Sequence, residues 1–292
     1  MLRSLYTSIS GLKNHQTLLD TVGNNIANVN SYGFKASTVT FRDLLTQTVQ
    51  GASAPSAVLG GTNNRQIGLG MAVDSITQRF TQGAMQNTGV QSDLAIQGDG
   101  FFRVTSDATA AGLIANTQPT YYARAGNFTL DANGDLVTSD GYHIVGYPET
   151  AAGSGIPDPA NQGIINIPPA STKFWNVGQD GMVTRFDTAT NSLVTVGWIT
   201  LAKFANPSGL TSVGANKWQA SVNSGTETVD IPTGSLNNTG MGSLASGALE
   251  MSNVDLATEF TEMIRAQRGF QANTRVITTS DEVLQELVNL KR

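Results

Sequence analysis

The chain lacks cysteine entirely and holds only two histidines, His15 and His143, among its 292 residues. Without cysteine it has no disulfides, no thiolate metal ligands and no cysteine nucleophile. Two histidines far apart in the sequence also exclude a histidine-rich metal site and leave few bases for a serine hydrolase. We therefore predict no catalytic residues, no metal site and no cofactor.

The chain also has few charged residues. Lysine, arginine, aspartate and glutamate make up 13% of the chain, about half the ~25% of an ordinary soluble domain. The 17 basic and 22 acidic residues give a formal net charge of −5, which argues against nucleic acid and anionic membranes as partners. Depletion of charge is typical of surfaces that partners cover. The alternative on composition is an ordinary β protein rich in threonine and asparagine.

Long apolar runs are absent as well, so the sequence predicts no membrane-spanning helix. The N-terminal stretch MLRSLYTSISGLKNHQ is amphipathic and lacks the apolar segment and small-residue cleavage site of a secretory signal. If the protein leaves the cytoplasm, we expect export without a cleaved signal peptide.

Both ends of the chain show apolar periodicity, mostly at seven-residue spacing. Such spacing is typical of a helix with a narrow coiled-coil stripe. We therefore predict that the two terminal helices pair as a coiled-coil-like domain and carry the subunit-packing residues; a helical hairpin packed on a single-domain core is the alternative. The stripe residues are Leu5, Ile9, Leu12, Leu19 and Ile26, and Leu256, Phe260, Met263, Phe270, Ile277 and Leu284.

The middle of the chain has a different pattern. From about residue 71 to 235, short alternating apolar runs are divided by Gly, Asn, Asp and Pro. Asn133 and Gly134 form a strong hairpin signal between two such runs. This pattern favours an antiparallel barrel-like or sandwich domain.

The predicted fold class is therefore α+β, with an antiparallel β domain inserted between the terminal helices. Residues 1–47 and 250–292 form the discontinuous helical domain. Residues 71–249 form the β domain. Residues 48–70, rich in Gly, Ala, Ser and Asn, are predicted to be an extended linker or insertion.

Four stretches in collinear order resemble the flagellar rod and hook family. They are GNNIANVNSYGFK (23–35), LAIQGDGFFRV (94–104), YARAGNFTLDANGDLVTSDGYHIVGYP (122–148) and GALEMSNVDLATEFTEMIRAQRGFQANTRVITTSDEVLQELVNL (247–290). Within the family, the start of the chain looks most like the flagellar hook protein, particularly the short hook proteins of Gram-positive bacteria. The distal rod protein is the alternative, because the chain is too short for a full outer hook domain and residues 48–70 are a rod-like feature.

The resemblance implies a structural subunit of the hook that polymerises into a flexible tube and transmits torque from rod to filament. Under the alternative, the polymer is a straight, rigid distal rod. Both the hook and the rod interpretation imply a location in the flagellar basal body and hook, an appendage at the cell surface. The implied partners are copies of the same chain, rod and hook–filament junction proteins, the hook cap protein and the flagellar type III export apparatus.

The same resemblance places the exit from the N-terminal helix at GNNIANVNSYGFK. Asparagine side chains satisfy backbone groups where a helix ends, and glycine permits close approach or a left-handed backbone. The two aromatic residues are expected to anchor the exit to a neighbouring subunit; a solvated loop is the alternative. The predicted helix-exit residues are Gly23, Asn24, Asn25, Asn28, Tyr32, Gly33 and Phe34.

A soluble carbohydrate-binding β protein is a further alternative, raised by Trp175, Trp198 and Trp218. Such a protein needs its aromatic side chains on one exposed face. Trp198 lies in the apolar run VGWITL, where core packing is the better prediction.

Overall fold

The computed structural model describes residues 2–55, 60–106, 120–149, 156–158, 161–232 and 240–290. The chain divides into two compact units, each built from segments that are distant in sequence. The helical unit comprises Met1–Asn28, Ala36–Arg79 and Val254–Arg292, and the β unit comprises Val29–Lys35 and Phe80–Asn253. The predicted α+β class, with an antiparallel β region between two terminal helices, is confirmed.

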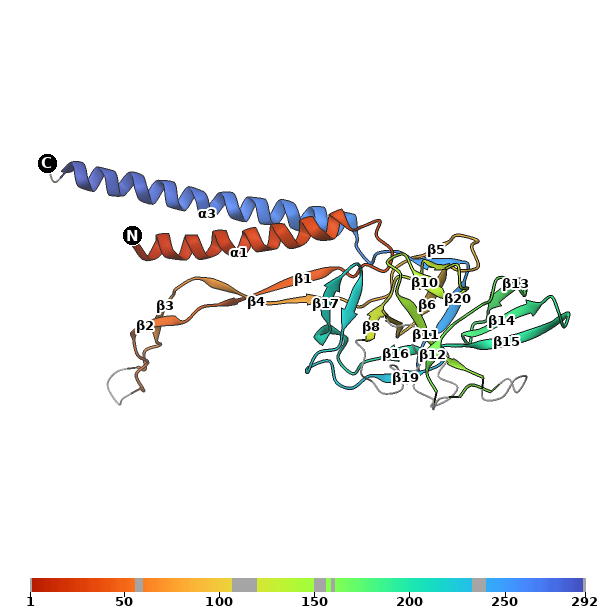
Figure 1. Cartoon of the computed structure of the whole chain (residues 1–292). Coiled ribbons are helices and arrows are strands. Elements are labelled where there is room, and N and C mark those ends of the chain that lie inside the picture. The colour runs from red at the N-terminus through yellow and green to blue at the C-terminus, as the bar shows by residue number, and fades with distance from the viewer. Residues whose placement is uncertain are drawn as a thin grey trace. The chain divides into compact units, whose positions relative to one another are not determined.

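In the helical unit, α1 (Leu2–Ala27) and α3 (Leu256–Leu290) lie side by side and antiparallel (Figure 1). Asp255 begins α3: its carboxylate accepts hydrogen bonds from the Ala257 backbone N–H at 3.0 Å and the Thr258 hydroxyl at 2.8 Å. These contacts hold the pKa of Asp255 below its usual value. No helix in the described ranges is long and apolar enough to span a membrane.

The rest of the helical unit is an extended β-hairpin. Strand β1 (Ser37–Asp43) pairs with β4 (Met71–Gln78), and β2 (Thr46–Gln50) pairs with β3 (Arg65–Gly68) further along the same hairpin, all antiparallel. The predicted extended linker or insertion at residues 48–70 thus includes most of β2 and all of β3, which pair as strands. All side chains of β2 and β3 are exposed. Since neither strand has a buried face, neither needs the alternation of apolar and polar residues by which a strand is recognised in a sequence.

Polar side chains attach α1 to this hairpin. The amide of Asn14 donates to the Met71 carbonyl at 2.6 Å, and the Ser10 hydroxyl accepts from the Met71 N–H at 3.4 Å. Further along, the Asn25 amide both donates to and accepts from the backbone of Ser37, at 2.9 and 3.0 Å. These bonds satisfy backbone groups of Ser37 and Met71, the first residues of β1 and β4. They therefore attach the start of each strand to α1.

The β unit is built from short antiparallel strands. One sheet has the order β13-β14-β15-β11-β7-β8-β18-β17, with β9, β10, β12, β16 and β19 attached to this path; β20 pairs with β6, and β21 pairs with β5. The strands are β5 (Met85–Asn87), β6 (Leu94–Gln97), β7 (Phe101–Thr105), β8 (Thr120–Ala123), β9 (Phe128–Leu130), β10 (Leu136–Thr138), β11 (His143–Pro148), β12 (Gly163–Ile164), β13 (Thr172–Val177), β14 (Met182–Asp187), β15 (Ser192–Ile199), β16 (Leu201–Lys203), β17 (Thr211–Gly214), β18 (Lys217–Gln219), β19 (Thr228–Asp230), β20 (Ser243–Ser246) and β21 (Ala248–Glu250).

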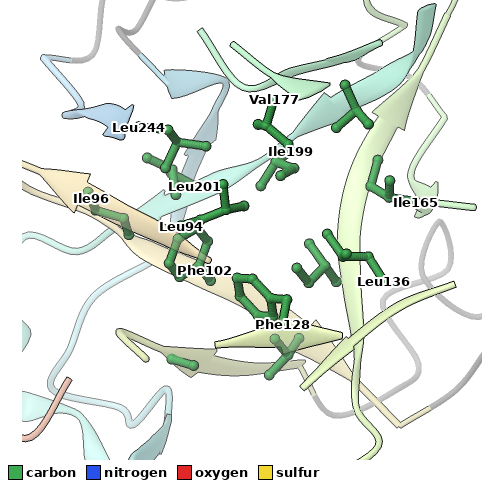
Figure 2. Packing of buried hydrophobic residues seen from close by; sticks show 14 of the residues in the cluster. Leu94, Ile96, Phe102, Phe128, Leu136, Ile165, Val177, Ile199, Leu201 and Leu244 are labelled. Carbon is green, nitrogen blue, oxygen red and sulfur yellow. The ribbon is translucent and has the colours of Figure 1, made fainter. Parts of the chain in front are cut away.

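A single large apolar cluster forms the core of the β unit (Figure 2). Phe102 packs edge-to-face on Phe128, with ring centroids 5.1 Å apart, and both are fully buried. Trp198 and Trp218 belong to two smaller buried clusters. Because these two tryptophans are core residues, they form no exposed aromatic platform of the kind that a carbohydrate-binding protein uses.

Candidate assembly surface

Small and polar residues form the seam between α1 and α3. The Asn25 amide donates to the Glu259 carboxylate at 3.1 Å, and both side chains are buried. Elsewhere the helices approach so closely that a Cβ added at Gly11 would lie 2.6 Å from the Asn273 amide nitrogen. A Cβ added at Gly269 would lie equally close to the His15 ring, at 2.6 Å. Glycine therefore sets the distance between the two helices at these points.

None of the predicted stripe residues on α1 is fully buried against α3. On α1, Leu5, Leu12, Leu19 and Ile26 are half-buried, and Ile9 is exposed. The closest approaches shown between the helices are at Gly11 and Gly269, and a hydrophobic pattern does not mark glycine. The coiled-coil description of the pair is not confirmed.

The stripe on α3 is more exposed than the stripe on α1. Met263, Ile277 and Leu284 are half-buried, whereas Leu256, Phe260 and Phe270 are exposed. Other large apolar residues of α3 share this exposure: Ile264, Val276, Val283, Leu287, Val288 and Leu290. A single helix rarely leaves so many apolar side chains in water unless another molecule covers them. Subunit packing through the two stripes stays a prediction.

The helix-exit residues divide between the two units. In the helical unit, α1 ends at Ala27, and both the backbone N–H and the side-chain amide of Asn28 donate to the Asn24 carbonyl, at 3.2 and 2.9 Å. These bonds close the last turn of α1. Gly23 lies inside the helix with nothing within 4 Å of where a Cβ would be, so no close approach explains it in this chain.

In the β unit, Gly33 has a left-handed backbone with φ of +69°, and its N–H donates to the Glu250 carbonyl at 2.8 Å. A Cβ at this position would lie 2.5 Å from the Ala125 backbone nitrogen. Tyr32 and Phe34 are half-buried within their own chain. Their expected role as anchors to a neighbouring subunit stays a prediction.

A buried ion network beside Gly33 was not predicted from the sequence. Glu250 accepts from Lys35 Nζ at 2.7 Å and from Arg124 Nε at 2.7 Å, and the Glu250 and Lys35 side chains are 0% and 1% exposed. The carboxylate also accepts from the Gly83 N–H at 2.9 Å, and Lys35 donates to the Thr81 carbonyl at 2.8 Å. The network therefore joins the segment after α1, the strand before α3 and the β sheet.

Burial and neighbouring charges shift the pKa values of Glu250 and Lys35 in this network. Burial raises the pKa of Glu250, but the nearby Arg124 and Lys35 outweigh it and hold the pKa below its usual value. Burial lowers the pKa of Lys35 in spite of the attraction of Glu250. Each of the three residues lies in a stretch that carries the family resemblance, but one sequence contains no signal that pairs charges so far apart along the chain.

No cluster of acidic and histidine residues suited to a metal ion lies in the described part of the chain. What the structure offers is a set of packing surfaces: paired terminal helices with apolar residues left exposed, a hairpin attached to them, and a stable β unit. These features are typical of a structural protein that assembles with other molecules.

Comparison with known proteins agrees with this class. Three family models match, described as flagella basal body rod protein (residues 5–35), flagellar hook protein FlgE/F/G D1 domain (residues 95–185) and flagellar basal body rod FlgEFG protein C-terminal (residues 245–290). The flagellar basal-body rod protein FlgG of Bacillus subtilis is 50% identical over 293 residues, covering 100% of each chain. The FlgG of Borreliella burgdorferi is 37% identical over 296 residues, again covering 100% of each.

The chain belongs to the flagellar basal-body rod and hook protein family. Members of this family are structural proteins that self-polymerise in the flagellar basal body, so the prediction that the chain is no enzyme is confirmed. The preference for the hook protein is not supported. The hook protein FlgE of Borreliella burgdorferi is 30% identical over an alignment of 455 residues covering 100% of each chain, so much of that hook protein has no counterpart here.

Proposed function

We propose that this chain is a subunit of the distal flagellar rod, where copies polymerise into a straight, rigid shaft. The observation that carries the proposal is the end-to-end match with proteins named as basal-body rod protein, at 50% and 37% identity and nearly equal length. The match with a hook protein has lower identity and requires long gaps. Torque transmission needs no chemistry, so the absence of a predicted catalytic residue fits this function.

The helical unit supports a rigid polymer. Its hairpin, from Ser37 to Gln78, carries exposed apolar residues that include Leu45, Val49 and Ile67. In a packed polymer, each hairpin would contact a second subunit as well as its own α1, and such cross-contacts oppose sliding between subunits. The partners under this proposal are copies of the chain, other rod proteins, the hook at the outer end and the type III export apparatus, with export requiring no cleaved signal.

Deletion of the gene and electron microscopy of isolated basal bodies test the proposal. A distal rod subunit is expected to leave a truncated rod with no hook, and the intact gene should restore both. Complete rods that lack only the hook would show that the chain is a hook subunit instead. As a second measurement, polymers of the purified chain should be straight; tubes with regular curvature would contradict the rod assignment.

A further inference from the structure

The chain passes between the helical unit and the β unit four times. From the bounds of the two units, these crossings fall after Asn28, Lys35, Arg79 and Asn253. Both helices and the hairpin between them are therefore joined to the β unit through four short stretches of backbone. The residues of the β unit beside each crossing decide where those segments begin.

One residue, Glu250, contacts the stretches beside all four crossings. It lies three residues before the last of them. Its Oε1 atom accepts from Lys35 Nζ at 2.7 Å, at the second crossing, and from the Gly83 N–H at 2.9 Å, just after the third. Its backbone carbonyl accepts from the Gly33 N–H at 2.8 Å, in the stretch between the first crossing and the second.

Thr81 is a second shared acceptor in the same place. Its backbone carbonyl accepts from Lys35 Nζ at 2.8 Å and from the Asn253 side-chain amide at 3.2 Å. Its hydroxyl accepts from the same amide at 2.9 Å. Lys35 and Asn253 are the residues at which the chain leaves the β unit, and Thr81 is the second residue after it returns. Three crossings thus meet at one backbone carbonyl.

Arg124 attaches this cluster to the sheet of the β unit. Its Nε donates to Glu250 Oε2 at 2.7 Å, its Nη2 donates to the Gly98 carbonyl at 2.6 Å, and its Nη1 donates to the Gly100 carbonyl. The side chains of Arg124 and Glu250 are 5% and 0% exposed. Because buried charges cannot exchange their partners for water, these directional bonds fix the carboxylate on the sheet.

The cluster shortens the connection between the two helices. Gly33 is the sixth residue after Ala27, where α1 ends, and Glu250 is the sixth residue before Leu256, where α3 begins. The hydrogen bond from Gly33 to Glu250 therefore leaves only a short tether on each side. Joining two segments across a long loop costs entropy, and a fixed junction between them removes much of that cost.

The pairing of α1 with α3 needs such help in the single chain. Phe260, Ile264 and Phe270 of α3 are all exposed, so these large apolar side chains contribute little to the contact. A pair of helices without a buried apolar seam depends strongly on the local concentration of one helix near the other.

We propose that the Lys35–Glu250–Arg124 network is a clamp that gathers the four crossings and makes the pairing of α1 with α3 depend on a correctly folded β unit. Its three charged residues come from distant segments, so the clamp is complete only after the sheet has formed. Each α1 then pairs with the α3 of its own chain in preference to that of another copy. The clamp does not depend on whether the polymer is a rod or a hook, so its failure leaves the proposed function untouched.

A disulfide between the two helices of the full-length chain tests the clamp, and the natural lack of cysteine leaves the engineered pair as the only thiols. A Cβ at Gly11 would lie 3.0 Å from Asn273 Cγ, so Gly11→Cys with Asn273→Cys places two Cβ atoms within the ~4.5 Å that a disulfide allows. In a glutathione redox buffer, the ratio of oxidised to reduced chain in dilute monomer gives the effective concentration of the two helices. Adding Glu250→Gln should lower this concentration about tenfold or more.

The matched control is Leu136→Ala in the same cysteine background. Leu136 lies in the apolar core of the β unit and takes no part in the clamp, so this variant lowers the stability of the same unit by a different route. At temperatures where the β unit is folded, it should change the effective concentration less than about twofold. An equal fall in both variants would mean that any weakening of the β unit separates the helices, which would overturn the proposal.

A second variant covers the case in which Glu250→Gln does not fold. Lys35→Met leaves Glu250 bound to Arg124 and to the Gly83 N–H, so no charge in the β unit loses its last partner. With folding checked by tryptophan fluorescence, Lys35→Met should lower the effective concentration about fivefold. An unchanged value in the folded variant would mean that α1 and α3 hold each other without the clamp, and the proposal would be wrong.

Discussion

Glu250 is a carboxylate with almost no contact with water, and it is held there by two cations and a backbone N–H. Removing the charge leaves Lys35 and Arg124 buried without a counter-ion. We expect Glu250→Gln to lower the free energy of unfolding of the β unit by on the order of 3 kcal/mol at pH 7. Urea titration followed by tryptophan fluorescence measures this, since Trp198 and Trp218 are in that unit. The control is Asp99→Asn, in an exposed pair with Lys203 of the same unit, which should cost under about 0.5 kcal/mol.

The same carboxylate predicts a pH dependence. The folded pKa of Glu250 is below the ordinary value of 4.5, so the stability that it contributes is present above pH 4.5 and is lost as the pH falls through the folded value. Wild-type stability should therefore fall between neutral pH and pH 3 more steeply than that of Glu250→Gln. Parallel loss in the two proteins would mean that other carboxylates control the acid response.

Gly33 offers a second test at the scale of one residue. Its φ of +69° and the 2.5 Å approach of the Ala125 nitrogen to a Cβ leave no room for a side chain. Gly33→Ala should destabilise the β unit by about 2 kcal/mol or more. Gly23→Ala is the matched control, because Gly23 is helical and its Cβ would meet open space; it should stabilise α1 by about 0.5–1 kcal/mol. Equal effects of the two changes in thermal unfolding would contradict this account.

At the scale of elements, the two terminal helices could be predicted from their apolar spacing, but the surface by which they pair could not. The spacing marks large apolar residues, whereas the closest contacts involve Gly11, Gly269 and Ala266, which the pattern treats as neutral. Many of the large apolar residues of α3, such as Phe260 and Phe270, are exposed in the single chain. We predict that a polymer subunit of this kind separates folding from assembly, with small residues pairing its own helices and large apolar residues contacting other subunits.

Phe270 tests that separation. It is 37% exposed in the single chain, so Phe270→Asp should change monomer stability by less than about 1 kcal/mol. If the α3 stripe is covered in the polymer, the same aspartate becomes a buried, unpaired charge that costs several kcal/mol per subunit. We expect a folded, helical monomer that does not form sedimentable polymers.

The control for Phe270 is Gln271→Asp, which places the same charge on the next, exposed residue. It should polymerise like the wild type. Normal polymers from Phe270→Asp would show that this position lies outside the subunit contacts.

At the scale of the whole molecule, the order of helix, β region and helix was predictable because periodicity changes sharply along the chain. The hairpin could not be predicted in the same way, since β2 and β3 bury no side chain. Backbone pairing holds these two strands together, and the Gln66 amide donates a hydrogen bond to the Thr48 hydroxyl across them. The Lys35–Glu250–Arg124 network could not be predicted from the sequence either, because its three residues come from distant segments of the chain. Both omissions concern features that only the assembled fold brings together.

The hairpin supplies the last prediction, which concerns the polymer as a whole. Removing residues 46–68 deletes β2 and β3 and leaves Leu44, Leu45, Leu69 and Gly70 as a four-residue loop between the paired residues Asp43 and Met71. Because the deleted strands bury no side chain, the thermal transition of the monomer should shift by less than about 2 °C. If the hairpin contacts a second subunit in the rod, the deletion should make the polymer curved or flexible in electron micrographs.

A companion variant separates the length of the hairpin from its apolar surface. Val49→Ser with Ile67→Ser keeps both strands but removes two exposed apolar side chains, 63% and 47% accessible in the single chain. Curvature in both variants would assign the stiffness to these side chains, because the hairpin backbone is intact in the second. If only the deletion gives curved polymers, the stiffness depends on the length of the hairpin and not on these two side chains. Straight polymers from the deletion would contradict any role of the hairpin in rigidity, since no part of β2 or β3 would then remain to provide it.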